Sequence, residues 1–253
     1  MKRLDASLIT PVYVKQQENA PLPEDPVYYL LTSDNLYLCR NHPLYRSCVP
    51  APLWPTELCP HATSLAPRFP LVPQHEFERI CGFLGHVSDD RGAEAIALLA
   101  WDNVEGVVRT IVPRQVSAVG NGGWGTTYPI GVKYECPRDL PPHWTLFCDV
   151  HSHCELSAYA SQTDIDDEEN FTGLHIVVGR MHQEPPDFHV EAAVDGARFS
   201  FKISDVVAAY EGRASFPSEW LDRVAVTDHR SFLEFRFDDI SPGPTGRGAQ
   251  GSW

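Results

Sequence analysis

A pair of histidines followed by a serine and an aspartate at fixed spacing constrains this chain more than any other feature of its sequence. The stretch reads His151-x-His153, then seven residues, then Ser161-x-x-Asp164. Side chains two positions apart on a β-strand project from the same face, so a strand ending here would present both imidazoles together. After a short crossover, Asp164 can return to the same point. Two imidazoles and one carboxylate form a three-ligand zinc set with an open fourth position, which is typical of catalytic rather than structural zinc sites.

The serine and the aspartate also fit the start of a helix. Ser161 followed three residues later by Asp164 is like a capping box, and the acids between Asp166 and Glu169 suit the positive end of the helix dipole. A helix start would hold Asp164 rigidly and direct Ser161 into the same cavity. The ligand interpretation and the capping interpretation are therefore compatible.

Two other interpretations of this stretch are less favoured. Cys154 directly follows the second histidine, and we interpret it as a neighbour of the metal, because a fourth protein ligand would close the site. An H-x-H pair can also mark a metal-dependent amidohydrolase on a β/α barrel. Here only about 100 residues follow the pair, which is too few for the remaining barrel strands.

The composition of the sequence limits where the protein can act and which partners it can bind. The chain has 253 residues, which suits one large domain or a core domain with an added piece. No apolar run approaches the roughly 18 residues of a membrane span, and the N-terminus turns polar too early for a signal peptide, so we expect a cytoplasmic protein without membrane partners.

The seven cysteines form no CxxC pair, and we expect most of them to be reduced. The net charge of −14 disfavours nucleic acid as a partner, whereas it suits a basic protein partner or simply solubility.

Changes of composition along the sequence predict three parts of the chain. Residues 1–72 are Pro-rich, and we interpret them as a β-rich accessory module. A hairpin is expected there from Val27–Thr32 and Leu36–Cys39. The prolines between Val49 and Pro73 exclude regular secondary structure in that stretch. Residues 73–212 form the expected core domain. Residues 213–253 form a C-terminal extension with a disordered Gly/Pro-rich tail.

Helical and strand patterns alternate within the core domain, so we expect a fold of the α/β (α+β) class. Helices are expected at 74–87, from Ser161 to Asn170 and at 204–210, and strands at 93–101, 107–112, 144–150, 175–180, 190–194 and 198–203. Between Val119 and Gly131 we expect a long Gly-rich loop containing Trp124. It lacks the context of a nucleotide-binding loop, and it is a candidate for a mobile flap that contacts substrate.

The spacing of His151, His153, Ser161 and Asp164 resembles the JAB/MPN metalloprotease family, in its JAMM motif. The surroundings resemble bacterial members in three stretches, which are Leu140–Pro142, Gly173–Arg180 and Asp195–Phe199, and the resemblance covers about residues 73–210. It implies a cytidine-deaminase-like mixed β-sheet flanked by helices. Bacterial relatives are typically encoded beside ubiquitin-like proteins and their activating-like enzymes.

The family also has a glutamate at the start of a strand, and two residues are candidates for it. Glu94 follows a predicted helix and a short turn and begins an apolar strand, which is the family order. Glu78 precedes Gly82 and Gly85, but its spacing to the first glycine is off by one and it lies in a helical pattern. We favour Glu94, although Ala97 stands where the family has a glycine.

The resemblance implies a function and a role for each residue. His151, His153 and Asp164 would hold Zn²⁺, which lowers the pKa of a bound water from 15.7 to about 7. Glu94 would be the general acid–base and Ser161 would stabilise the oxyanion. The implied reaction is peptide or isopeptide cleavage after the C-terminal Gly of a ubiquitin-like protein or its conjugates, with an activating-like or conjugating-like enzyme as a further partner. Two alternatives stay open: a zinc hydrolase of another small peptide-like bond, such as a sulfur-carrier C-terminus, and a non-catalytic scaffold that binds a ubiquitin-like partner.

Overall fold

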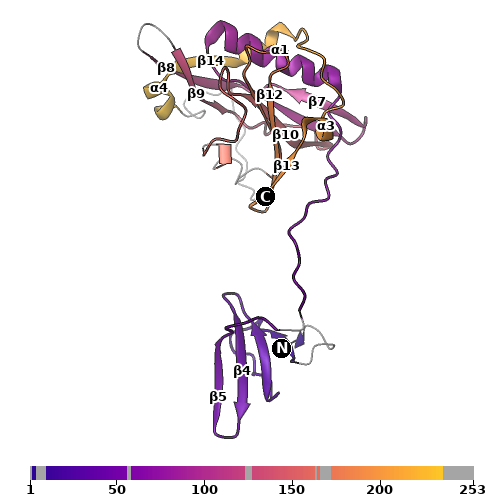
Figure 1. Cartoon of the computed structure of the whole chain (residues 1–253), viewed down its shortest axis with the longest axis vertical. Helices are drawn as coiled ribbons and strands as arrows, with labels where there is room; N and C mark the ends of the chain where they lie inside the picture. The colour runs from indigo at the N-terminus through magenta and orange to yellow at the C-terminus, as the bar shows by residue number, and fades with distance from the viewer. Residues whose placement is uncertain are drawn as a thin grey trace. The chain divides into compact units, whose positions relative to one another are not determined.

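The computed structural model describes residues 2–3, 10–55, 58–122, 127–162, 164–165 and 172–235. The chain divides into two compact units, Met1–Leu65 and Ala66–Trp253 (Figure 1). It is a mixed α+β protein in which most elements are strands, arranged in three sheets with few helices. Among the helices of the described residues, none is long and apolar enough to cross a membrane.

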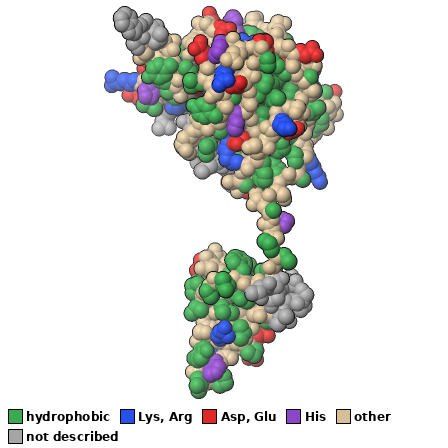
Figure 2. Space-filling model, viewed as in Figure 1, with side chains coloured by type: hydrophobic (Ala, Val, Ile, Leu, Met, Phe, Trp, Pro, Cys, Tyr) green, Lys and Arg blue, Asp and Glu red, His purple; other side chains and the backbone are tan. Residues whose placement is uncertain are grey.

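The N-terminal unit is a five-stranded sheet with the order β1-β2-β3-β4-β5. Its strands are Lys2–Arg3, Val12–Val14, Val27–Leu31, Leu36–His42 and Tyr45–Pro50. The expected hairpin is confirmed as β3 and β4. Strand β5 was not expected, because its side chains are nearly all exposed and leave no pattern of burial in the sequence. Hydrophobic side chains are prominent on the visible face of this unit (Figure 2).

Two cysteines of this unit face each other across β4 and β5. Cys39 and Cys48 are register partners and are joined by a disulfide. Cys59 of the same unit and the four cysteines of the second unit are free. Most cysteines are therefore reduced, as expected.

A six-stranded mixed sheet forms the centre of the second unit, with the order β13-β12-β11-β10-β6-β7. In that order the strands are Ala197–Phe201, Asp187–Val194, Gly173–Gly179, Trp144–Ser152, Ile96–Asp102 and Val107–Ile111. Strand β10 is central, parallel to β11 on one side and antiparallel to β6 on the other. All of these strands were expected within a few residues, and β12 and β13 form the expected hairpin.

Helix α1 (Gln74–Arg91) lies against this sheet (Figure 1). Its buried Phe77 packs on Phe188 of β12, while its buried Phe83 packs on Phe216 and Trp220 of the segment after residue 212. We expected it to end before Asp89, and this is wrong because the acidic pair lies on the helix surface without interrupting it. The helix ends at Gly92, which has φ 60° and donates its N–H to the carbonyl of Ser88 at 2.9 Å. Glycine is the residue that adopts this left-handed conformation without strain.

A second, three-stranded sheet with the order β14-β8-β9 lies in the same unit. Strands β8 (Gln115–Asn121) and β9 (Thr127–Tyr134) form a hairpin, so the expected long loop from Val119 to Gly131 is wrong. The alternation of Tyr128, Ile130, Val132 and Tyr134 is a strand pattern that outweighs the neighbouring glycines. Trp124, the expected flap residue, lies outside the described residues.

The segment after residue 212 contributes to this sheet. Strand β14 (Val224–Asp228) pairs in parallel with β8, and it lies between a 3-10 helix, η2 (Ser218–Arg223), and helix α4 (His229–Glu234). The expected helix at 204–210 is only α3 (Ile203–Val206). The Gly/Pro-rich tail falls outside the described residues.

Candidate metal centre

Strand β10 carries both histidines of the motif to the edge of a cavity. Its C-terminal half is fully buried, His151 lies near its end, and His153 follows directly after it. His151 is 7% exposed and His153 is 4% exposed. Between the two histidines, Ser152 makes two hydrogen bonds with Ala95, which precedes β6. The Ser152 N–H donates to the Ala95 carbonyl at 3.0 Å, and the Ser152 Oγ accepts the Ala95 N–H at 3.1 Å.

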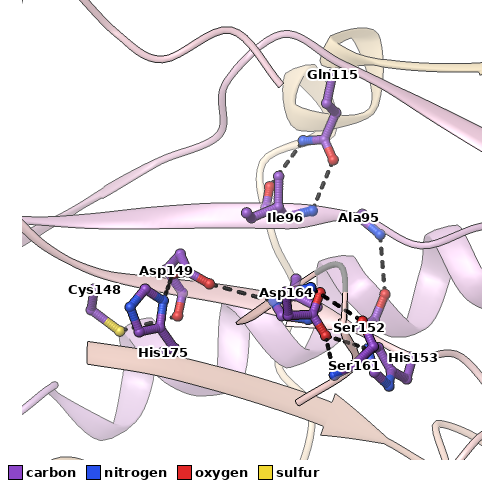
Figure 3. Close-up of polar contacts among 11 residues, drawn as sticks. Ala95, Ile96, Gln115, Cys148, Asp149, Ser152, His153, Ser161, Asp164 and His175 are labelled. Carbon is purple, nitrogen blue, oxygen red and sulfur yellow. Dashed lines mark hydrogen bonds and ion pairs between the residues drawn. The ribbon is translucent and has the colours of Figure 1, made fainter. Parts of the chain in front are cut away.

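Asp164 reaches the two histidines from a short helical segment. The Asp164 carboxylate accepts the N–H of Ser161 at 2.7 Å, and the Ser161 hydroxyl accepts the N–H of Asp164 at 3.2 Å. This reciprocal pair is the expected capping box. It leaves Asp164 Oδ1 3.5 Å from His151 Nε2. The other oxygen, Oδ2, lies 3.4 Å from His153 Nε2 (Figure 3). The acids Asp166–Glu169 lie outside the described residues.

The three side chains form a group that could hold a metal ion. One ligand atom from each of His151, His153 and Asp164 lies within 4.8 Å of the other two. His151 Nε2, the ring nitrogen that faces Asp164, is buried and makes no hydrogen bond to any described residue. A buried nitrogen without a partner is costly, and a cation that accepts its lone pair removes that cost. The donor set therefore fits a divalent metal, as the motif predicts.

Each ring nitrogen of His151 lies beside a carboxylate. Asp149 Oδ1 lies 3.4 Å from His151 Nδ1, and Asp164 lies beside Nε2. Burial opposes charge on His151, but the nearby carboxylates of Asp149 and Asp164 outweigh it and raise the pKa of His151 to about 10. Burial likewise opposes ionisation of Asp164, yet its two histidine partners hold its pKa well below the usual range. The centre is thus built to accommodate positive charge.

A third histidine, His175, belongs to the same cluster and was not singled out from the sequence. It lies on β11 directly opposite Asp149 on β10, and its Nδ1 makes a close hydrogen bond to Asp149 Oδ2 (Figure 3). Burial opposes ionisation of Asp149, but hydrogen bonds with His151 and His175 lower its pKa to about 2. Asp149 is therefore an anion that joins the two histidines.

Glu94 lines the same cavity as the metal-ligand candidates. It precedes β6 and is 9% exposed. Burial raises the pKa of Glu94 above its ordinary value, while the nearby His153 and His151 act in the opposite direction. A carboxyl group that is buried in a cleft, and whose pKa is raised, is suited to exchange a proton near neutral pH.

The other glutamate candidate lies elsewhere. The Glu78 carboxylate, on α1, accepts the N–H of Glu211 and an N–H of the Gln74 amide, each at 2.8 Å. It is not among the residues that line the cavity. These contacts give Glu78 a structural role at the helix surface, and they leave Glu94 as the glutamate beside the ligand group.

The cavity has a volume of about 220 Å³ and two kinds of wall. Its polar lining consists of Glu94, Ser161 and the histidine–aspartate cluster. Its apolar lining comes from β9 and from Leu156 and Tyr159. The ring of Tyr159 stands edge-on to His153, with 4.9 Å between the ring centroids.

Cys154 is buried but is not part of the ligand group found among the described residues. Burial raises the pKa of its thiol to about 12, and its side chain hydrogen-bonds Ser88 on α1. A thiol in this state is a poor metal ligand, because the thiolate is the form that binds metals. This agrees with its interpretation as a neighbour of the site.

Comparisons with known proteins assign no family. No protein-family model matches the chain, and no curated protein matches it. Among solved structures, the chain is similar to the solution structure of protein DSY2949 from Desulfitobacterium hafniense, with a TM-score of 0.31 and 11% sequence identity over 56% of this chain and 94% of that one. A similarity of this size carries no argument about fold family or function.

Proposed function

We propose that this chain is a zinc-dependent peptidase or isopeptidase of the JAB/MPN type, which cleaves after the C-terminal Gly of a ubiquitin-like protein. The observation that carries the proposal is the convergence of Glu94, Ser161 and the His151–His153–Asp164 group in one cavity. These residues come from three segments of the chain, around Glu94, His151 and Ser161, and their convergence supports the roles that the motif implies. The mixed sheet with β10 at its centre is in keeping with the cytidine-deaminase-like fold of that family.

The residues would divide the reaction among them. His151, His153 and Asp164 would hold Zn²⁺, which when bound activates water and polarises the scissile carbonyl. Glu94 takes the proton of the attacking water and delivers it to the leaving amine. Its buried position and raised pKa support that exchange. The Ser161 hydroxyl accepts the Asp164 N–H, so its own proton is available to donate to the developing oxyanion.

Strand β9 offers a place for an extended substrate. It is the edge strand of the three-stranded sheet, and its residues Pro129–Val132 and Tyr134 line the cavity. Val132 and Tyr134 of β9 pair with Ser117 and Gln115 of β8, which contact the backbone of Glu94 and Ile96. A peptide tail that adds to this edge would carry its scissile bond past the polar residues of the cavity.

The experiment uses the full chain and a bacterial ubiquitin-like protein, fused through its C-terminal Gly to a reporter protein. Wild type, Glu94→Gln, Glu78→Gln and a chelator-treated sample are compared. We expect cleavage after the Gly by wild type and by Glu78→Gln, and loss of cleavage in the other two samples.

A zinc-loaded wild type that binds the fusion without cutting it would contradict the proposal and favour a scaffold. Cleavage only of a sulfur-carrier fusion would move the substrate to that class. An activating-like or conjugating-like enzyme added to the assay tests for the further partner.

A further inference from the structure

We propose that His175 is a positioning residue that acts through Asp149 to fix the orientation of the metal-ligand candidate His151. The inference rests on the metal site of the proposed function and does not depend on the substrate. It assigns a role to a buried histidine that lines the cavity but is not in the ligand group.

The strand register creates this arrangement. Asp149 and His175 are direct partners on the parallel strands β10 and β11, so their side chains share a face. His151 follows Asp149 by two residues on the same strand and shares that face too. The Asp149 carboxylate thereby meets one imidazole with each oxygen: Oδ2 contacts His175 Nδ1, and Oδ1 lies 3.4 Å from His151 Nδ1.

All three side chains of this arrangement are buried, so water does not replace their contacts with one another. His175, Asp149 and His151 are 3%, 6% and 7% exposed, respectively. A buried carboxylate requires hydrogen-bond donors in place of water, and His175 supplies one. With one oxygen fixed by His175, rotation of the carboxylate is restricted, and the other oxygen stays at His151 Nδ1.

The consequence falls on the metal-binding nitrogen of His151. When Nδ1–H donates to Asp149, the neutral ring carries its lone pair on Nε2, which faces Asp164. A carboxylate behind a ligand histidine fixes its tautomer and orientation and increases its basicity. Loss of His175 would leave Asp149 free to turn away, so that His151 loses this constraint although none of its own atoms has changed.

His189 provides a matched control within the same sheet. It lies on β12 in the row His151–Val177–His189, so it shares the sheet face with His151. Its Nε2 lies 3.4 Å from the Glu191 carboxylate, so its polar contact is with a residue outside the Asp149 group. A substitution at His189 therefore perturbs a histidine on the same face whose polar partner is Glu191, while Asp149, His175 and His151 themselves stay unchanged.

The test measures metal affinity directly, with Zn²⁺ in competition with a chromophoric chelator. The absorption spectrum of bound Co²⁺ reports the geometry of the ligand set. The full-length variants are His175→Leu, His175→Asn, Asp149→Asn, the double variant His175→Leu/Asp149→Asn, and the control His189→Leu. Asn at position 175 keeps an N–H donor close to the position of Nδ1. Thermal unfolding of each metal-free chain records structural effects separately.

We expect His175→Leu and Asp149→Asn each to weaken Zn²⁺ affinity by about 10–100-fold, the range found for partners of metal-ligating histidines. The double variant should be no weaker than Asp149→Asn alone, because both substitutions interrupt one path. His175→Asn should retain most of the affinity, and His189→Leu all of it. The Co²⁺ spectrum should change in His175→Leu and not in His189→Leu.

Three results would overturn the inference: unchanged affinity in His175→Leu, fold-changes that multiply in the double variant, or an equal loss in His189→Leu. A wild type that binds no metal would refute the metal site and this inference together. Conversely, a wild type that binds metal with the expected pattern, but cleaves no ubiquitin-like fusion, would support the inference while the proposed function fails.

Discussion

The side-chain amide of Gln115 pairs with both backbone groups of Ile96. Gln115 Oε1 accepts the Ile96 N–H at 2.8 Å, and Nε2 donates to the Ile96 carbonyl at 2.9 Å (Figure 3). Two residues further along β8, the Ser117 hydroxyl donates to the Glu94 carbonyl at 2.5 Å. The backbone around Glu94 is thus held by β8, which also pairs with the cavity-lining strand β9.

Replacing Gln115 by leucine should destabilise the second unit. Gln115 is 2% exposed, so the substitution leaves the two backbone groups of Ile96 buried without partners. An unsatisfied buried group costs about 1–3 kcal/mol, so we expect the free energy of unfolding to fall by about that amount for each. Urea unfolding measures the change. Gln183→Leu is the control, because Gln183 is exposed, and an equal loss in both variants would contradict the assigned role.

Metal should stabilise the folded chain through the ligand group. A ligand at 100 times its Kd adds about 2.7 kcal/mol to the free energy of unfolding if it binds only the folded state. We expect Zn²⁺ to raise the Tm of wild type and a chelator to reverse the effect. Alanine at His151, His153 or Asp164 should abolish the shift, whereas alanine at the exposed His182 should leave it intact. A shift that persists in His153→Ala would place the metal elsewhere.

Ser161 should contribute to turnover more than to metal binding. Removing one oxyanion donor lowers kcat by about 10²–10³-fold, and we expect Ser161→Ala to do so in the fusion assay with little change in KM. Ser161→Thr keeps a hydroxyl and should retain most activity. Zn²⁺ affinity is measured in parallel, because the Ser161 hydroxyl also accepts the Asp164 N–H. If metal affinity falls as far as kcat does, Ser161 acts by holding Asp164 instead.

The metal-ligand candidates were predictable because their arrangement is local. His151 and His153 follow from the alternation of side chains along one strand, and Ser161 with Asp164 from the capping of one helical turn. His175 depends on the pairing of two strands whose partner residues are 26 positions apart. The available signal was a histidine near the start of the next apolar strand. It becomes informative only once β10 and β11 are known to be parallel neighbours.

The fold was predictable where burial leaves a period in the sequence, and less so elsewhere. The strands of the central sheet show apolar runs, as in β6 and β11, or apolar residues alternating with polar ones, as in β13, and the sequence predicts them within a few residues. The hairpin of β8 and β9 is not predicted, because glycines at 120–125 obscure the alternation that follows them. Strand β14 is short and largely exposed, and its place beside β8 comes from tertiary pairing between segments about 110 residues apart.

Gly179 should be required for the shape of the cavity wall. A Cβ atom there would lie 2.2 Å from the Ala158 nitrogen and 2.5 Å from the Leu156 carbonyl oxygen. These are backbone atoms, which cannot rotate away, so Gly179→Ala would displace the segment that carries Tyr159 and leads to Asp164. We expect a loss of about 1–3 kcal/mol in stability, as for other overpacked sites, together with weaker Zn²⁺ binding.

The control for this prediction is the neighbouring Val178, which is fully buried and whose side chain points to the opposite face of β11 from Val177 and the site. Val178→Ala should also lower stability, because it removes buried methyl groups. It should leave Zn²⁺ affinity unchanged, since the segment before Asp164 keeps its place. Equal Zn²⁺ affinity in Gly179→Ala and wild type would mean that the segment absorbs the added methyl group without moving Asp164, and that the close approach at Gly179 serves stability alone.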